Sequence, residues 1–340
     1  MAAATGTRKP GKIKLVKINL IPGGLMKLHQ LQVFLSVVEQ GSLHGAARAL
    51  KLSPPAITVT IRELEKLLGV PLLTRSVNGV KLTEYGTLFQ RRATLLVSDM
   101  RRTQDELLAM RESRGGRVSM TVSSVVAGAL APQAFVEFRK SMPNTSVVFR
   151  ESPLPAALSA LHNGETDFAV VNGAPGTPWP DFVEQKDILS IPLFAVARHG
   201  HPLGRVRTLK RLLDQEWLLP CEPGDNVDKA FVQFFEQLGL TAPQRILRCQ
   251  SLFPTIMLLK TTDVIGIVTE PTFRLEVAQH KISVLRVGEA FPETTVSTVV
   301  RRDRPLTAAA QCFLSCFEEV AKRFALARGS EPFGSQKSKR

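Results

Sequence analysis

The chain has 340 residues, enough for two or three domains, and its 44% hydrophobic content excludes wholesale disorder. The net charge of +14 is concentrated toward the N-terminus. Residues 1–25 carry five basic and no acidic side chains, and residues 26–114 carry thirteen basic and eight acidic ones. This distribution indicates a polyanionic partner, with nucleic acid the first candidate and a membrane surface the second.

Cysteine and hydropathy patterns point to a reducing compartment. The four cysteines are too sparse for a disulfide framework, which indicates a cytoplasmic location. Cys312 and Cys316 lie one helical turn apart, but no matching His or Cys pair lies nearby, so we expect no metal and no cofactor. No apolar segment approaches the ~18 residues that cross a bilayer. Residues 1–25 are expected to form a disordered basic extension, unless Met26 is the natural start.

The first periodic segments predict three short helices. Apolar residues from Leu28 recur at helical spacing until Gly41, and Ser42 can cap a second helix, "LHGAARAL". After the turn "KLS", Ser53 caps a third helix with two prolines in its first turn, where proline is tolerated. This arrangement predicts that the free N–H groups at the start of the third helix can face phosphate.

A hairpin follows the third helix. Two β-prone runs flank Asn78-Gly79, a strong turn signal. Helix, tight turn, helix and hairpin describe a winged helix-turn-helix over residues 26–84, whose third helix would enter the major groove of DNA. A Thr hydroxyl there can bind a base or a phosphate, and basic side chains can bind phosphate. The predicted DNA contacts are Ser42, Ser53, Pro54, Pro55, Thr58, Val59, Thr60, Arg62, Arg75 and Lys81.

Residues 85–114 read as one long helix. Its apolar residues recur at steps of three, four and seven, which is typical of a self-pairing seam, although a helix packed on its own domain is the alternative. The predicted dimerisation residues are Tyr85, Phe89, Ala93, Leu96, Met100, Leu107 and Met110. A hinge is expected at Gly115-Gly116.

Strand and helix signals alternate from residue 115 to residue 328, and residues 329–340 look like a disordered tail. The alternation predicts parallel sheets covered by helices, which is an α/β fold. "HGHP" contains His199 and His201, but no third ligand is evident, so we expect a turn there rather than a metal site.

Residues 26–86 resemble the DNA-binding domain of LysR-type transcriptional regulators, through "LQVFLSVVEQGSLHGAARALKLSPPAITVTIRELEKLLGVPLLTR" and "GVKLTEYG". The family commonly has Gln where Pro54 stands, Ser where Thr58 stands, and Phe in the stretch that here contains Leu72 and Leu73. Chain length and element order extend the resemblance to about nine-tenths of the sequence. The resemblance implies a dimer that assembles further into a tetramer, with RNA polymerase as a further candidate partner.

The resemblance also implies a periplasmic-binding-protein-like effector domain, with lobe I at 117–190 and 290–326 and lobe II at 191–289. Its effector would be a small organic molecule, with a carboxylate as the first suggestion. Ligands of open α/β sheets bind beyond the carboxyl ends of strands. That rule selects Ser123, Ser124, Asn172, Gly173, Glu222, Gly224, Asn226, Ser251, Phe253 and Thr269 as effector contacts, although each could instead be a helix cap.

The sequence therefore predicts a sequence-specific transcription regulator that responds to a small effector and is not an enzyme. No G-x-S-x-G, Walker A, G-x-G-x-x-G or H-E-x-x-H motif is present. The alternative is a two-lobed α/β enzyme or solute-binding module that carries a helical cap without a DNA-binding role.

Overall fold

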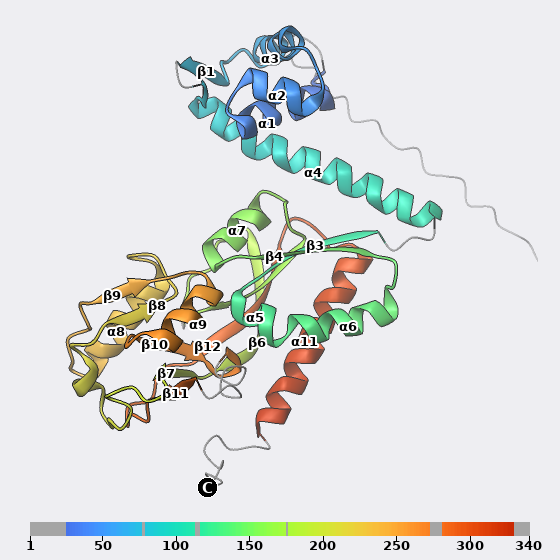
Figure 1. Ribbon diagram of the computed structural model, residues 1–340. Helices are drawn as coiled ribbons and strands as arrows, with labels where there is room; N and C mark the ends of the chain where they lie inside the picture. The colour runs from blue at the N-terminus through green and yellow to red at the C-terminus, as the bar shows by residue number, and fades with distance from the viewer. Residues whose placement is uncertain (1–24, 77–78, 113–115, 175, 273–280, 330–340) are drawn as a thin grey trace, which may run out of the picture. The chain divides into compact units, whose positions relative to one another are not determined.

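The computed structural model describes residues 25–76, 79–112, 116–174, 176–272 and 281–329 (Figure 1). The expected disordered segments at the two ends lie almost wholly outside these ranges, as do Asn78 of the turn and Gly115 of the hinge. The chain divides between Val97 and Ser98 into two compact units. Within the described ranges, no helix is both long enough and apolar enough to cross a membrane.

The N-terminal unit is a three-helix bundle with a hairpin. Its elements are α1 (Leu28–Gln40), α2 (Leu43–Leu50), α3 (Pro54–Leu68), β1 (Leu73–Ser76), β2 (Gly79–Leu82) and the start of α4 (Glu84–Glu112). β1 and β2 pair antiparallel and form the wing. Two serines cap the second and third helices: Ser42 Oγ accepts the Gly45 N–H at 3.0 Å, and Ser53 Oγ accepts the Ala56 N–H at 3.3 Å.

One hydrophobic core joins these elements. Phe34, Ile57, Leu64 and Leu72 are fully buried within it. The ring of Phe89 in α4 packs edge-on against Phe34 with the two centroids 5.1 Å apart. Burial of each large side chain contributes about 1.5–3 kcal/mol, so the start of α4 is an integral part of this unit.

The C-terminal unit contains two α/β lobes. In lobe I the strand order is β4-β3-β5-β12-β6. Its strands are β3 (Arg117–Val122), β4 (Ser146–Glu151), β5 (Phe168–Gly173), β6 (Val183–Ile191) and β12 (Thr294–Arg301). Its helices are α5 (Ser124–Ala129), α6 (Ala131–Ser141), α7 (Leu154–His162) and α11 (Ala308–Gly329). Phe138 and Phe313 stack in its core with centroids 4.2 Å apart.

Lobe II has the strand order β11-β7-β10-β8-β9. Its strands are β7 (Leu193–Arg198), β8 (Trp217–Leu219), β9 (Ile246–Arg248), β10 (Ile265–Thr269) and β11 (Ile282–Val284). Its helices are the 3₁₀ turn η1 (Leu209–Leu212), α8 (Asn226–Gln237) and α9 (Leu252–Thr261). Trp217 is buried at its centre, and its indole N–H donates to the Leu212 carbonyl at 3.0 Å.

The prediction of parallel sheets is only partly right. β3, β4 and β5 run parallel, as do β8, β9 and β10, but β12 is antiparallel to β5 and β6, and β7 is antiparallel to β10 and β11. The reason is the chain path in Figure 1, where the chain passes from β6 into β7 and returns from lobe II into β12. A strand that enters a sheet from the other lobe runs opposite to the βα units already there.

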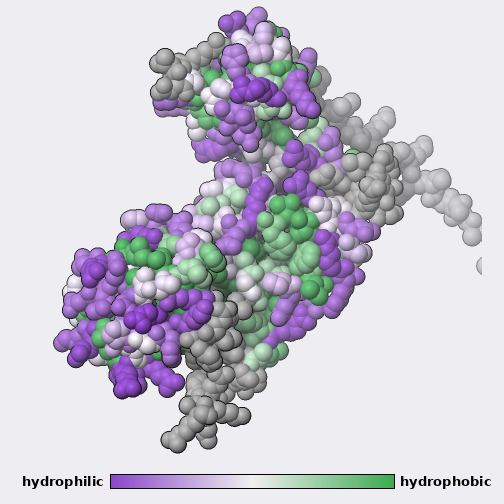
Figure 2. Space-filling model, viewed as in Figure 1, coloured by the Kyte–Doolittle hydropathy of each residue, from purple (hydrophilic) through white to green (hydrophobic). Residues whose placement is uncertain are grey.

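Hydrophobic residues gather on one outer face of lobe I. Figure 2 shows them over β4 and α6, where Phe149 is 42% and Val136 is 57% exposed. β4 lies at the edge of its sheet, and an exposed apolar edge strand is a surface on which another chain can pair.

Candidate functional site

The outward face of α3 is the first candidate surface. Ile57, Ile61 and Leu64 are buried, and a rotation of 100° per residue places Pro55, Val59, Arg62 and Lys66 opposite that stripe. Those four side chains are exposed, with Val59 at 53%. Thr58 and Thr60 lie on the two flanks and are half-buried. Lys66 was missed in the sequence analysis, although its i, i+4 spacing from Arg62 could have revealed it.

The prediction that the start of α3 offers free N–H groups is wrong. Pro54 and Pro55 have no N–H, the Ala56 N–H donates to the Ser53 hydroxyl, and the Ile57 N–H donates to the Ser53 carbonyl at 3.2 Å. The cap and the prolines together leave no free backbone donor at residues 54 to 57. These four residues therefore offer a phosphate no free backbone N–H group.

The wing is fastened to α3 and α1 by contacts that involve the backbone. Glu65 of α3 accepts the backbone N–H groups of Leu72 and Leu73 with the same carboxylate oxygen, at 2.7 and 3.1 Å. On the second strand, the Val80 N–H donates to the Gly41 carbonyl at 3.0 Å. Because these bonds join different secondary-structure elements, no local sequence pattern predicts them. They fix the direction in which the wing leaves the bundle.

Close backbone approach explains two glycines near the wing. An ideal Cβ on Gly79, whose φ is 113°, would lie 2.6 Å from the Gly41 carbonyl oxygen, and one on Gly86 would lie 2.0 Å from that of Leu72. Only glycine fits either position. Lys81 is exposed on β2. The backbone of Arg75 pairs with Val80, but the Arg75 side chain lies outside the described part of the structure.

The seam predicted along α4 is split by the structure. Tyr85, Leu96, Met100 and Leu107 are 46–61% exposed, whereas Ala93 is fully buried and Phe89 packs against Phe34. Ala93 is therefore a core residue of its own unit, and so in large part is Phe89, because the first turns of α4 cover the bundle. Leu88, 55% exposed and absent from the predicted set, joins the exposed apolar side. The side chain of Met110 lies outside the described residues.

Hydrogen bonds join the predicted effector residues of lobe I at the carboxyl ends of its strands. The Ser123 hydroxyl accepts the Asn172 backbone N–H at 3.3 Å, and the Asn172 amide donates to the Thr294 hydroxyl at 3.3 Å. Thr294 donates in turn to the Gly173 carbonyl at 2.9 Å. Ser124 donates to the Glu151 carboxylate. Thr294 was not predicted, since it begins a strand that arrives from lobe II.

The predicted effector residues of lobe II are less uniform. Glu222 accepts a hydrogen bond from Gln250 at 3.1 Å, and Ser251 is exposed at the start of α9 without capping it. Phe253 is 72% exposed, and Thr269 is buried with its hydroxyl 3.0 Å from that of Thr272.

Gly224 and Asn226 belong instead to the turn into α8. The Gly224 N–H donates to Asp228 at 2.8 Å, and Asp225 rather than Asn226 caps that helix. Helix capping is therefore sufficient to explain this turn. It remains the weakest part of the predicted effector set.

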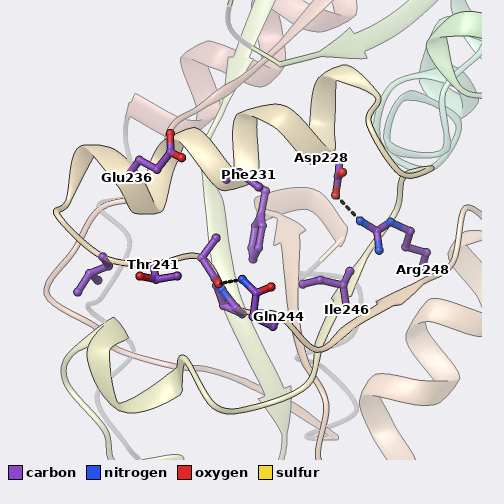
Figure 3. Close-up of a pocket in the computed structure, with 11 residues that line it drawn as sticks. Asp228, Phe231, Glu236, Thr241, Gln244, Ile246 and Arg248 are labelled. Carbon is purple, nitrogen blue, oxygen red and sulfur yellow. Dashed lines mark hydrogen bonds and ion pairs between the residues drawn. The ribbon is translucent and has the colours of Figure 1, made fainter.

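A separate pocket of about 460 Å³ lies on the flank of lobe II between α8 and β9 (Figure 3). Phe231 and Ile246 contribute apolar lining, and Asp228 forms an ion pair with Arg248 at 2.5 Å. None of the ten predicted effector residues lines it. Polar side chains, including Glu236 and Gln244, line much of the rest of the pocket, which lies beside the edge strand β9.

Polar contacts attach the later part of α4 to lobe I. The Ser98 hydroxyl donates to the Gly164 carbonyl, Arg102 lies 3.9 Å from Asp167, and Arg304 pairs with Asp99 at 2.6 Å. Burial lowers the pKa of the Arg304 guanidinium, an effect that Asp99 opposes. Asp167 immediately precedes β5, whose other end carries Asn172 and Gly173. One strand thus connects the predicted effector cleft with α4, called the linker helix below.

Within the described residues, no group of three or more His, Cys, Asp or Glu side chains is placed to hold a metal ion. His201 accepts the Leu203 N–H at 3.0 Å, and its other ring nitrogen lies 3.1 Å from the Asp263 carbonyl. These bonds hold the "HGHP" turn to the loop before β10.

Comparison with known proteins identifies both units. The bacterial regulatory helix-turn-helix model of the lysR family matches residues 28–87, and the LysR substrate binding domain matches residues 111–322. The HTH-type transcriptional regulator GalR of Pseudomonas putida is 27% identical over 301 residues, covering 87% of this chain and 74% of that protein. The regulator PcaQ of Agrobacterium fabrum is 27% identical over 299 residues, covering 87% and 95%.

Solved structures show the same fold. The LysR family transcriptional regulator CbnR superposes with a TM-score of 0.66 at 20% identity, over 87% of this chain and 99% of that one. Full-length CbnR complexed with its target DNA gives 0.64 at 22% identity, over 88% and 99%. The two family models together span most of the sequence, and the chain belongs to the LysR family of transcriptional regulators.

Proposed function

We propose that this regulator binds double-stranded DNA by placing α3 in the major groove, with the β1–β2 wing beside it. The observation that carries this proposal is the outward face of α3. Arg62 and Lys66 are exposed there, and within the described residues neither forms an ion pair. Unpaired cations one turn apart on a rigid helix can bind two phosphates of one strand. CbnR, which shares the fold, was solved in complex with its target DNA, and this supports DNA as the partner.

Salt dependence tests these phosphate contacts. Each phosphate neutralised by a basic side chain adds about −0.9 to the slope of log K against log salt. Arg62→Ala and Lys66→Ala should each make the slope shallower by about one unit on the full-length chain, and Lys229→Ala, an exposed lysine of lobe II, is the matched control. Unchanged slopes in both α3 variants would contradict the proposed docking. Arg75 and Lys81 remain proposed contacts of the wing, and the helix-capping residues Ser42 and Ser53 remain proposed contacts of the helix starts.

We propose that a small effector binds between the lobes at the strand ends that carry Ser123, Asn172, Ser251 and Thr269. The charges there argue against the carboxylate suggested by the sequence. Glu151, Glu222 and Glu293 accept hydrogen bonds from the neutral side chains of Ser124, Gln250 and Ser190. Arg248, which ends β9, has its guanidinium paired with the Asp228 carboxylate, so its positive charge is already compensated.

An anionic ligand would meet repulsion at this cleft, so a neutral or cationic effector fits better. A thermal-shift screen of the full chain against matched acids, amides and amines tests this. Stabilisation by acids alone would contradict it.

We propose that effector binding reaches the DNA through β5 and α4. A ligand that alters the Asn172–Thr294 end of β5 also displaces its Asp167 end, which holds Arg102 of the linker helix. The network of Arg304, Asp99 and Ser98 attaches the same helix to lobe I. Such a path needs two arrangements with different ligand affinity, and the lobes provide the moving parts.

Self-association completes the proposal. The exposed apolar side of α4, with Tyr85, Leu88, Leu96, Met100 and Leu107, would pair with a second copy, so that two copies of α3 contact half-sites roughly 34 Å apart. The exposed hydrophobic residues over β4 and α6 of lobe I offer a further surface for tetramer assembly. Light scattering on the full chain tests this, and a monomer at micromolar concentration would contradict it. A cytoplasmic location, contact with RNA polymerase and the lack of catalytic activity belong to the same proposal.

A further inference from the structure

The first two turns of α3 present hydrocarbon to the solvent on their outward face. Pro55 and Ala56 are exposed, and Val59 is 53% exposed. Arg62 and Lys66 follow on the same face. A valine that is needed for the core is normally buried, and Ile57 and Ile61 already fill that role. The cations of α3 thus lie next to an apolar patch made of Pro55, Ala56 and Val59, here called the apolar edge.

Hydrogen-bond donors that could compete with the apolar edge are already occupied. Both prolines lack an N–H, and the Ala56 N–H donates to Ser53. The Thr60 hydroxyl donates to the Ala56 carbonyl at 2.9 Å within the helix. Thr58 retains its hydroxyl but lies on the flank, half-buried. The centre of this face can therefore contact a base edge by van der Waals packing, and not by donating a hydrogen bond.

Only one base offers a matching group in the major groove. Thymine carries a C5-methyl there, while the other bases present hydrogen-bond donors and acceptors that an apolar surface leaves unpaired. We propose that Val59, with Pro55 and Ala56 around it, selects thymine by packing against its C5-methyl group. The proposal rests on the DNA-binding function proposed above and adds its base preference. It assigns specificity to Val59 rather than to the hydroxyl of Thr60.

Replacement of thymine by deoxyuridine isolates the methyl group. A duplex is first enriched from a random pool by the full-length protein, and each thymine is then replaced singly by deoxyuridine at one fixed salt concentration. Burial of one methyl group corresponds to about a fourfold change in affinity. In the wild-type protein, uracil at one or more positions of each half-site should weaken binding by roughly three- to fivefold.

Four variants separate the contributions. Val59→Ala should bind the thymine and uracil duplexes with nearly equal affinity, and Val59→Thr, which keeps one methyl, should give an intermediate ratio. Thr60→Val, which removes the internally bonded hydroxyl, should keep the wild-type pattern. Lys66→Ala should weaken binding to both duplexes by the same factor. Val59 is largely exposed, so its variants should fold, which circular dichroism checks.

Three results would overturn the inference while leaving DNA binding intact. One is a set of uracil duplexes that bind as tightly as the thymine duplex. Another is a Val59→Ala protein that keeps the full uracil penalty, and the third is a Thr60→Val protein that loses it. Failure of the proposed function is a different result, namely that no duplex is enriched or that Arg62→Ala and Lys66→Ala leave the salt slope unchanged.

Discussion

Replacement of Glu65 by alanine should release the wing from α3. One carboxylate oxygen of Glu65 accepts the Leu72 and Leu73 N–H groups at 2.7 and 3.1 Å. Leu72 is fully buried, so its amide gains no water in exchange for the lost acceptor. A hydrogen bond to a charged acceptor contributes about 1.5–3 kcal/mol. Since Glu65 is only half-buried, we take the lower end and expect a loss of about 2–3 kcal/mol for the pair.

Hydrogen–deuterium exchange of the full chain measures this loss locally. At 1.4 kcal/mol per tenfold change, the exchange of the Leu72 and Leu73 amides should accelerate roughly 30- to 150-fold. Amides of β10 in the C-terminal unit should exchange as in the wild type. Glu63→Ala is the matched control, because Glu63 lies on the exposed side of the same helix. An acceleration below about threefold, or one equal to that of Glu63→Ala, would refute the reasoning.

Three further predictions concern the C-terminal unit. Burial raises the pKa of the Glu289 carboxyl, but hydrogen bonds from Thr208 and Leu209 of the 3₁₀ turn lower it by more, so the pKa lies below its ordinary value. The stabilisation that Glu289 provides is therefore present above the unfolded-state pKa and is lost as pH falls through the lower folded value. Glu289→Gln should therefore flatten the acid limb of a tryptophan fluorescence titration, and an unchanged limb counts against the cap. Arg304→Ala should weaken the effect of the effector on DNA affinity without abolishing DNA binding, measured by fluorescence anisotropy with and without ligand. Burial raises the pKa of Cys221 to about 12, so at pH 8 iodoacetamide should label half-exposed Cys249 well before Cys221, as peptide mass spectrometry would show.

Local signals predicted the helix starts and the buried stripe of α3 in the N-terminal unit. Ser42 and Ser53 predicted the two helix starts because a capping hydroxyl acts within three residues of its own position. The 3.6-residue period predicted the buried stripe of α3, including Ile57 and Ile61. Such features depend on neighbours along the chain, so they are readable without a structure.

Features that depend on distant segments were missed or misjudged. The bond from Glu65 to Leu72 spans seven residues and exists only once the wing has folded back. The burial of Ala93 depends on which side of α4 meets the bundle, and a heptad pattern cannot distinguish a domain core from a dimer seam. The antiparallel direction of β12 depends on the return of the chain from lobe II.

The sequence by itself determined the family, the helix caps and the positions of the basic side chains, because these follow from residue type and short-range spacing. The tertiary structure alone decided which of those side chains remain available. It shows that the donors at the start of α3 are consumed and that Val59 is exposed among cations. It also shows carboxylates at the strand ends of the effector unit. Availability is a property of three-dimensional packing, since a hydrogen bond or a buried contact withdraws a group from binding whatever its place in the sequence.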